Sequence, residues 1–340
     1  MSQTSPSPSP SRVVTFGELM LRLSPPGQER LLQSPELRAG FGGCEANVAV
    51  GLAHLGVRVD YVSRLPDNPI GAAALHALQA EGVGTEWMVR GESSERMGIY
   101  FVEPGADIQA SRVVYDRAGS AFARITASMV DWARVLSGAG RGGGATWFHG
   151  SGITPALGEG PHALLAAAIA AARARGASVS LDLNYRPALW QKRDPRPLIE
   201  PLVRDTDLLI GNRDAVRAML GIEADGGSLA PRLADRFGCR RVAVTRREVL
   251  SANEHGWSAG LYDAEAGSAW TSHRHQVRVV DRVGGGDSFA AGLIAALLAE
   301  RPPAEAVEFA AAAGALKLTV PGDWNRVTRE EIEQLVHACT

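Results

Sequence analysis

The sequence predicts an α/β protein with a mainly parallel central sheet. Apolar segments typical of strands and of helices alternate along most of the 340 residues, and short glycine-rich or polar stretches follow the strands. Hydrophobic residues make up 45% of the chain and charged residues 21%, as in ordinary globular proteins. Alternating strands and helices produce a parallel sheet with helices on both faces. Ligands of such sheets bind at the carboxyl ends of the strands, so the loops there are the candidate functional segments.

The predicted elements follow one another in a regular order. Each strand is a short apolar run, and each helix is a longer run with an apolar face, often with a glycine near its end. Strands are expected at 13–18, 57–63, 145–149, 177–183, 207–211 and 241–245. Helices are expected at 48–56, 68–81, 161–176, 195–204, 214–220 and 228–237, and a buried helix is expected over 290–298.

The segment 96–125 interrupts this alternation. Residues 97–103 and 111–116 have the composition of strands, and the Pro-Gly-Ala-Asp sequence at 104–107 between them is typical of a turn. This pattern predicts an inserted small sheet or lid. Near the N-terminus, serine and proline alternate, and residues 1–11 are expected to form a disordered tail.

Charge and cysteine content exclude several classes of function. A formal net charge of -2 provides no basic surface for nucleic acid. The cysteines Cys44, Cys239 and Cys339 show no metal-ligand spacing and favour a reducing compartment. The N-terminal segment lacks the apolar core of a signal peptide, and no apolar run of about 18 residues is present. We therefore expect a cytoplasmic protein with neither a membrane nor a nucleic-acid partner.

Residues 281–289 carry a chemical signal. Gly284, Gly285 and Gly286 precede Asp287 where the buried helix is expected to begin. Backbone N–H groups at a helix N-terminus lack intrahelical partners and attract anions, and glycines let a phosphate approach closely. An aspartate beside a phosphate would take a proton from a hydroxyl that attacks the phosphorus. Taken alone, these residues fit a plain helix cap and turn equally well.

With a second motif, this segment resembles the ribokinase-like (PfkB) family of sugar kinases. Residues 281–287 are similar to the family signature D-T-x-G-A-G-D, with Arg282 and Gly285 as variants, and residues 42–49 are similar to its signature G-G-x-x-x-N-x-A. The resemblance implies a three-layer αβα sandwich forming a single kinase domain over 12–340. It also implies a β-lid formed by the segments near 19–41 and 96–125, and the use of ATP with Mg²⁺.

The resemblance is greatest to the 2-keto-3-deoxygluconate kinases of that family. It is carried by residues 115–121, 150–157 and 182–190. In such kinases two arginines contact the carboxylate of the substrate, and here they would be Arg117 and Arg186. A guanidinium offers a planar pair of donors that matches a carboxylate. Outside the motifs, either arginine would be as readily a solvated or salt-bridged loop residue.

The resemblance implies roles for further residues. Asp287 would be the catalytic base, and Gly284, Gly285 and Gly286 would hold the phosphoryl oxygens. Substrate would be bound by Gly42, Gly43, Asn47, Tyr100, Tyr115, Arg117, Arg186 and Asp323. Nucleotide would be bound by Asn212, Thr245, Arg247, Gly284 and Gly286, and Asp281 would reach Mg²⁺ through water. The two tyrosines could instead pack the lid sheet, and Asp323 could be a simple turn residue.

Three positions depart from common patterns of the family. Arg22 stands near the place where kinases of neutral sugars often carry an aspartate, which suits an acid substrate, although a solvated arginine fits equally well. The usual N-x-x-E motif is incomplete, because Ala215 stands three residues after Asn212. The segment 245–257 lacks the early glycines of the nucleotide loop and is expected to be a longer loop. Nucleotide preference is therefore open.

The expected reaction is transfer of the ATP γ-phosphoryl group to the 6-hydroxyl of 2-keto-3-deoxygluconate. The alternatives are a fructokinase or another PfkB-type sugar kinase, because fold does not decide substrate, and a catalytically impaired sugar-binding protein. A dinucleotide-binding oxidoreductase would need G-x-G-x-x-G after the first strand, which residues 16–19 do not supply. A lid sheet has free edges, so we expect a homodimer through that sheet.

Overall fold

The computed structural model describes residues 11–137, 144–191, 193–223 and 226–339. The strands of its main sheet are β1 (Arg12–Phe16), β4 (Arg58–Val62), β9 (Trp147–Ser151), β10 (Ser178–Asp182), β11 (Leu208–Asn212), β12 (Arg241–Ser251), β13 (Glu254–Asp263), β14 (Ser268–Thr271) and β15 (His275–Arg278). Their order is β14-β13-β12-β11-β10-β9-β1-β4, and β15 also pairs with β13. The six strands from β4 to β12 are parallel, and β13 is antiparallel to its partners. The predicted mainly parallel sheet is confirmed.

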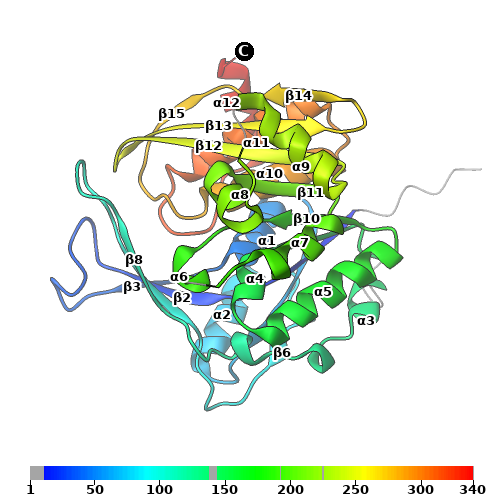
Figure 1. Ribbon diagram of the computed structural model, residues 1–340. Helices are drawn as coiled ribbons and strands as arrows, with labels where there is room; N and C mark the ends of the chain where they lie inside the picture. Colours follow the sequence, from blue (N-terminus) through cyan, green and yellow to red (C-terminus); the bar gives the residue numbers. More distant parts are fainter. Residues whose placement is uncertain (1–10, 138–143, 192, 224–225, 340) are drawn as a thin grey trace, which may run out of the picture.

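Helices cover both faces of this sheet (Figure 1). One face packs against α1 (Cys44–His54), α2 (Pro69–Ala80), α10 (Gly285–Leu298), α11 (Pro303–Lys317) and α12 (Arg329–Cys339). The other packs against α3 (Trp132–Ser137), α5 (Glu159–Ala174), α7 (Arg196–Arg204), α8 (Arg213–Leu220) and α9 (Leu229–Phe237). Successive side chains of a strand point to opposite faces, so Val13 belongs to the first core and Val14 to the second.

The remaining elements are short. They are the helices α4 (Ile153–Ala156) and α6 (Pro187–Trp190), the 3₁₀ turns η1 (Phe122–Arg124), η2 (Ala127–Met129) and η3 (Gly226–Ser228), and the strand pair β5 (Arg64–Leu65) and β6 (Val89–Arg90). Among the described residues, no helix combines the length and the apolar character that crossing a membrane requires.

A separate four-stranded sheet projects from the side of the main body (Figure 1). It consists of β2 (Met20–Ser24), β3 (Arg38–Gly42), β7 (Ile99–Glu103) and β8 (Arg112–Asp116), in the order β3-β2-β7-β8. The parallel pairing of β2 with β7 joins two hairpins that lie far apart in the sequence. We call these four strands the small sheet.

The turn of the β7–β8 hairpin contacts the turn of the β12–β13 hairpin. The amide of Ala252 donates to the carbonyl of Asp107 over 2.8 Å, and the amide of Asp107 donates to Asn253 Oδ1 over 2.5 Å. A small pocket lies between the two hairpins, with Arg22, Ser111 and Arg282 among its lining residues. The small sheet is therefore anchored to the main sheet at its tip.

The expected loop at 245–257 is wrong, because most of this segment is a β-hairpin. β12 continues to Ser251, β13 begins at Glu254, and the pairing runs from Arg241 opposite Asp263 to the turn. Most side chains at 246–250 are exposed, so no apolar and polar alternation marks this part of the strand. Backbone pairing with β13 and the contact with the small sheet keep it extended.

Candidate functional site

The three glycines lie at the start of α10. Gly284 caps the helix with a φ of 86°, in the left-handed region that favours glycine. A Cβ at Gly284 would collide with the carbonyl oxygen of Asp323, and a Cβ at Gly285 would lie 2.9 Å from Leu318. A Cβ at Gly286 would meet no atom within 4 Å, so open space borders the first turn. The N–H groups of a first helical turn are unpaired within the helix, which makes this space an anion site.

Asp287 stands in the first turn of α10 and is 7% exposed. Asn47 of α1 donates its side-chain amide to Asp287 Oδ2 over 2.6 Å. Asn184, which follows β10, donates to Asp287 Oδ1 over 3.3 Å. Each oxygen of the Asp287 carboxylate therefore accepts one side-chain amide, and the two asparagines that donate lie far apart in the sequence. The structure therefore brings the expected base, Asp287, to the anion site and fixes its orientation.

Asn184 and Asp182 belong to the site, although the sequence gave no reason to single them out individually. Asn184 adopts a φ of 41°, which is uncommon outside glycine. Asp182 supports this conformation, because its Oδ1 accepts the backbone N–H of Asn184 over 2.9 Å. Burial and the charge of Asp287 raise the pKa of Asp182 to about 7. The only local feature that marks Asn184 as a site residue is its positive φ, and a backbone angle cannot be read from the sequence.

Cys44, Asp182 and Asp287 approach one another as metal ligands would, with ligand atoms within 4.8 Å. Burial, together with the charge of Asp287, raises the pKa of the Cys44 thiol well above its ordinary value. The thiol is therefore protonated, and sulfur is in any case a poor ligand for Mg²⁺. This cluster does not fit a magnesium site.

Gly42, Asn47, Tyr100 and Asp323 meet at one place. A Cβ on Gly42 would collide with both the Tyr100 hydroxyl and the Asp323 carboxylate. Asn47 Nδ2 lies 3.4 Å from Asp323 Oδ2, and the adjacent Gly43 donates its backbone N–H to Asn47 Oδ1 over 3.3 Å. Tyr100 stacks on Tyr115 with ring centroids 6.0 Å apart. The structure thus joins six of the eight sequence-predicted substrate residues in one network of contacts, which Asn47 connects to Asp287.

Asp281 and Arg22 are engaged with each other. Arg22 contacts Asp281 Oδ2 over 2.5 Å and Asp323 Oδ1 over 2.6 Å. The backbone N–H groups of Val283 and Gly322 donate to the two oxygens of Asp281, each over 3.0 Å. The oxygens of Asp281 hold the turn before α10, and the water-mediated role of Asp281 toward Mg²⁺ stays a prediction. Arg22 is not a solvated strand-end residue but a link between the small sheet and that turn.

The two arginines expected at the substrate carboxylate differ in their environment. Arg117 is buried and forms an ion pair with Glu18, whose Oε2 lies 2.8 Å from Arg117 Nε. Arg186 makes a hydrogen bond of 3.3 Å to the carbonyl of Tyr185 and, among the described residues, has no carboxylate in salt-bridge range. Arg186 is therefore available to an anionic ligand, whereas the guanidinium of Arg117 is already neutralised.

Arg247 and Arg282 lie in the electrostatic neighbourhood of Arg186. Arg247 is exposed on β12, yet partial desolvation of its guanidinium and the charge of Arg186 lower its pKa. Burial together with the charge of Arg247 lowers the pKa of Arg282. Arg282 donates to the hydroxyl of Ser111, the residue before β8. Within the described ranges, neither arginine has a carboxylate close enough for a salt bridge. Three unneutralised guanidinium groups in one region indicate a binding place for a polyanion.

Asn212 and Thr245 are neighbours at the carboxyl edge of the sheet, in register on β11 and β12. Asn212 Oδ1 accepts the backbone N–H of Ala215 over 2.8 Å and caps α8. Asp214, which stands one residue before the position of the missing acid, contacts Arg217 over 3.0 Å. Two of the sequence-predicted nucleotide residues, Asn212 and Thr245, are thus adjacent, and the carboxylate of the usual motif has no equivalent at Asp214.

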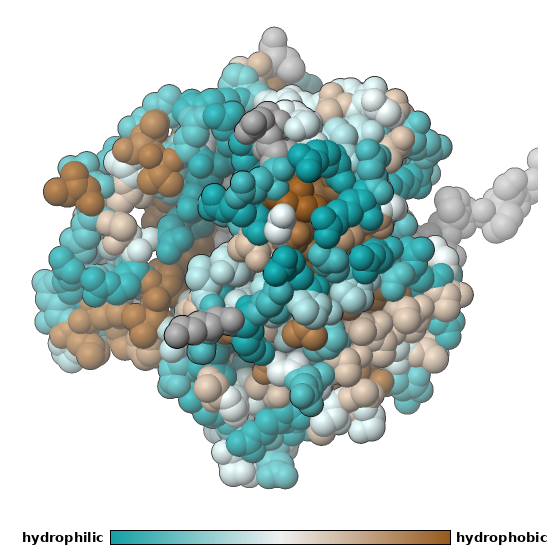
Figure 2. Space-filling model, viewed as in Figure 1, coloured by the Kyte–Doolittle hydropathy of each residue, from teal (hydrophilic) through white to brown (hydrophobic). Residues whose placement is uncertain are grey.

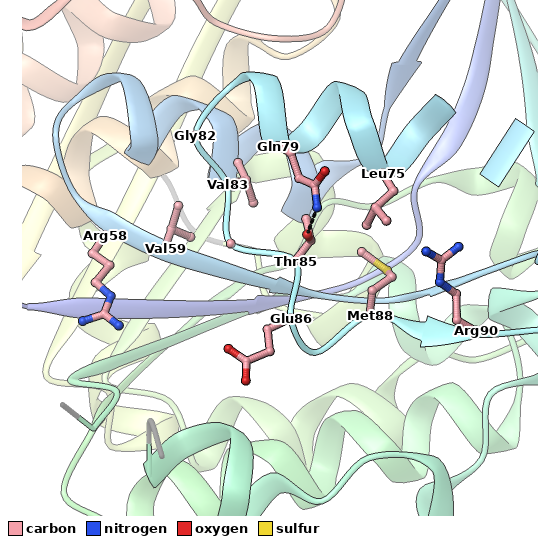
Figure 3. Close-up of a pocket in the computed structure, with 11 residues that line it drawn as sticks. Arg58, Val59, Leu75, Gln79, Gly82, Val83, Thr85, Glu86, Met88 and Arg90 are labelled. Atoms are coloured by element: carbon pink, nitrogen blue, oxygen red, sulfur yellow. Dashed lines mark hydrogen bonds between the residues drawn. The ribbon is translucent and has the colours of Figure 1, made fainter. Parts of the chain in front are cut away.

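Another pocket lies away from this site (Figure 3). It is lined by the beginning of β4, by Leu75 and Gln79 of α2, and by residues 82–86, Met88 and Arg90. Gln79 donates to the Thr85 hydroxyl over 2.9 Å across it. Arg58 and Val59 begin β4, so the pocket borders the amino end of that strand. It shares no residue with the network around Asp287.

The model of the pfkB family of carbohydrate kinases matches residues 10–329. The chain belongs to this family. Its fold and its nature as a carbohydrate kinase, both expected from the sequence, are thereby confirmed. In this PfkB kinase the anion turn, which we define as residues 281–286, and Asp287 correspond to the signature from which the resemblance was first drawn.

Two curated relatives cover nearly the whole chain. The 2-dehydro-3-deoxygalactonokinase of Haloferax volcanii is 35% identical over 328 residues, which are 96% of each protein. The 2-dehydro-3-deoxygluconokinase of Bacillus subtilis is 28% identical over 332 residues, which are 96% of this chain and 95% of the relative.

Solved structures agree with this assignment. The 2-dehydro-3-deoxygluconokinase of Thermotoga maritima is 41% identical, covers 96% of this chain and 98% of its own, and has a TM-score of 0.92. A fructokinase of Xylella fastidiosa solved with bound ATP is 22% identical, with a TM-score of 0.78 and coverage of 96% and 98%. The second likeness shows the common fold alone.

Proposed function

We propose that this PfkB kinase transfers the γ-phosphoryl group of ATP to the 6-hydroxyl of 2-keto-3-deoxygluconate (2-dehydro-3-deoxy-D-gluconate). The observation that carries the proposal is that an oriented carboxylate, Asp287, and a guanidinium without a salt-bridge partner, Arg186, lie in the same site. Asp287 is oriented by two amides beside the open first turn of α10. Arg186 lies in its electrostatic neighbourhood without a carboxylate of its own among the described residues. Phosphorylation of a neutral sugar would use Asp287 as base, but a neutral sugar has no carboxylate to pair with the guanidinium of Arg186.

The chemical roles follow from these positions. Asp287 takes the proton of the attacking hydroxyl as the new bond to phosphorus forms. The N–H groups of Gly284, Gly285 and Gly286 point to the developing negative charge. Arg247 and Arg282 are placed to hold the phosphates of the donor. When bound, ATP supplies the phosphoryl group and Mg²⁺ neutralises phosphate charge. The residues present fit ATP, whereas the ion would depend mainly on phosphate and water oxygens.

The acceptor would lie between the small sheet and Asp287. Gly42, Asn47, Tyr100 and Asp323 converge there and offer polar groups to the sugar hydroxyls. We assign the substrate carboxylate to Arg186. Because Arg117 is paired with Glu18, its role is to hold that part of the small sheet, and a contact with substrate would require the pair to open.

The 4-epimer, 2-keto-3-deoxygalactonate, is the second candidate acceptor. The observation that favours it is the 35% identity with the Haloferax volcanii kinase named for that sugar acid. Both candidates carry the carboxylate that Arg186 would bind and the same terminal hydroxyl. They differ only in the configuration of one carbon, which the contacts described above do not distinguish.

A coupled assay of ADP release tests the proposal. The wild-type protein is supplied with ATP and Mg²⁺ and with either epimer, fructose, ribose or no sugar. We expect kcat/KM to be at least about 100-fold higher for one of the sugar acids than for fructose. Higher turnover with fructose or ribose would overturn the acid assignment.

Variants of the expected carboxylate contact sharpen this test. Arg186→Ala should raise KM for the sugar acid by at least about tenfold and leave KM for a neutral sugar nearly unchanged. Arg196→Ala is the matched control, because Arg196 is exposed and pairs with Asp194 on the surface. Equal effects of Arg186→Ala on acid and neutral sugars would exclude a carboxylate contact.

We also propose that two copies associate through the small sheet. Its strands and turns expose Leu32, Ile108 and Val114, which are 78%, 97% and 45% accessible. Figure 2 shows hydrophobic side chains gathered on this projecting side of the molecule. Burying them would remove apolar surface from water and cover free strand edges. Light scattering should give the mass of a dimer, and Val114→Asp should shift it toward that of one chain; a monomeric wild type contradicts the proposal.

A further inference from the structure

Lys317 is a buried charge that the proposed reaction does not use. The chain has 33 arginines and only two lysines, Lys192 and Lys317. Lys317 ends α11 and is 0% exposed, although lysine is almost never fully buried unless its charge is paired. An ammonium is more compact than a guanidinium and carries its charge at one point. Nearly all other positively charged side chains of this protein are arginines, so a lysine here indicates that the position requires a compact ammonium group.

Lys317 lies directly behind the anion turn. A Cβ on Gly284 would be 3.1 Å from Lys317 Cε, so the lysine stem packs against the residue that caps α10. Lys317 Nζ donates to the carbonyl of Val320 over 3.0 Å. The next residue, Leu318, accepts the backbone N–H groups of Val280 and Asp281 over 2.8 and 3.2 Å. The end of α11 therefore supports the anion turn from behind.

The charges around Lys317 are mostly negative. The carboxylates of Asp281, Asp287 and Asp323 attract its ammonium, and the guanidinium of Arg22 is the positive group that opposes it. Three carboxylates with one arginine would repel an incoming phosphate. Burial lowers the pKa of Lys317, and Asp281 and Asp323 oppose that effect. A protonated Lys317 reduces the excess of negative charge at the place where the donor must bind.

We propose that Lys317 is a positioning residue for the phosphoryl donor. It acts through the anion turn, against which it packs from behind, and in its protonated form it adds a positive charge behind the N–H groups of Gly284, Gly285 and Gly286. A charge in this buried place is weakly screened, so it acts strongly over the short distance to a phosphate. This inference rests on the proposed kinase function, because the donor is the nucleotide of that reaction.

The substitution Lys317→Met tests the inference, since it keeps the length of the stem and removes the charge. We expect the Kd for ADP with Mg²⁺, measured by calorimetry without sugar, to rise by at least about tenfold. KM for ATP should rise similarly, while KM for the sugar acid changes less than about twofold. Lys317→Gln, which keeps a donor for Val320, should show the same loss; it also replaces the first variant if Lys317→Met does not fold.

A matched control separates this effect from general loss of stability. Arg64→Met removes another buried cation, which pairs with Glu95 over 2.8 Å. That variant should lower the thermal midpoint and leave the Kd for ADP unchanged. As a rescue experiment, ethylammonium chloride should restore part of the kcat/KM for ATP that Lys317→Ala loses. Sodium chloride at the same ionic strength should not restore it.

The outcomes are distinct. A Lys317→Met protein with a lower thermal midpoint and the wild-type Kd for ADP would make Lys317 a merely structural residue and overturn the inference. Equal increases in KM for ATP and for the sugar acid would do the same. A wild-type protein that binds ADP but phosphorylates no sugar would refute the proposed function, and a loss of ADP binding in Lys317→Met would still support the role of the lysine.

Discussion

Replacing Glu45 by glutamine should stabilise this kinase at neutral and alkaline pH. Glu45 lies in the first turn of α1 and is 1% exposed. Its Oε1 accepts the hydroxyl of Ser151 over 2.6 Å and that of Thr154 over 3.3 Å. Burial raises the pKa of Glu45 to about 7 in spite of these hydrogen bonds, and the charge of Asp287 acts in the same direction.

The size of the stability change follows from the difference between the pKa of Glu45 in the folded and in the unfolded chain. In the folded chain Glu45 keeps its proton up to a pKa of about 7, whereas the ordinary value of 4.5 applies after unfolding. Because the folded protein binds the additional proton between these values, its free energy of unfolding falls as the pH rises through this window. At about 1.4 kcal/mol per pH unit, the loss amounts to about 3 kcal/mol by pH ~8. Because the glutamine side chain does not ionise, the Glu45→Gln variant does not lose this stability as the pH rises.

The measurement is urea denaturation of wild type and Glu45→Gln at four pH values between about 5 and about 8. The difference in unfolding free energy between variant and wild type should increase by about 2.5 kcal/mol across this range. Taking the difference cancels the titration of other groups. Glu265→Gln is the control, because Glu265 lies in an exposed pair with Arg240. A difference that is constant with pH, or that shrinks, would refute the reasoning.

Three further predictions address the reaction and the acid limit of stability. Asp287→Asn should lower kcat at least about 100-fold with little change in sugar affinity, because an amide cannot accept the proton; near-normal kcat would remove the base assignment. Burial lowers the pKa of His149 to about 3 from its ordinary 6.5. The unfolded chain therefore binds a proton that the folded chain does not, and stability falls as the pH drops from 6.5 toward 3, by up to about 5 kcal/mol. Thermal melts at decreasing pH should show a shallower loss for His149→Asn, and parallel curves would count against this. Arg247→Ala and Arg282→Ala should each raise KM for ATP more than KM for the sugar acid in steady-state assays, and the reverse pattern would place them at the carboxylate.

Most of the fold could be predicted because its signals are local. The apolar strands β1, β4, β9, β10 and β11 and the helices between them were expected within a few residues of their observed bounds. The strands after β12 and the helices α11 and α12 were not predicted. The exposed end of β12 carries no alternation, and α11 is uniformly rich in small apolar residues, so neither has the periodic pattern from which an element is recognised.

The candidate site was predicted less completely. The anion turn is recognisable in sequence because Gly284 and Gly285 are required by the turn and by close packing. The positions of Asn47 and Asp323 followed from the family resemblance. Asp182 and Asn184 were not singled out, because their role depends on a backbone conformation after β10 and on the carboxylate of Asp287, 103 residues from Asn184.

The sequence by itself determined the class of fold, the place of the helix that begins at an anion site, and the membership of a kinase family. These features depend on neighbouring residues, whose spacing and size act directly on the local backbone. Only the tertiary structure decided which charges are free. Arg117 is neutralised by Glu18, 99 residues away, whereas Arg186 is left for a ligand, and Lys317 is buried behind the anion turn. Pairing and burial depend on distances through space, which no local pattern contains.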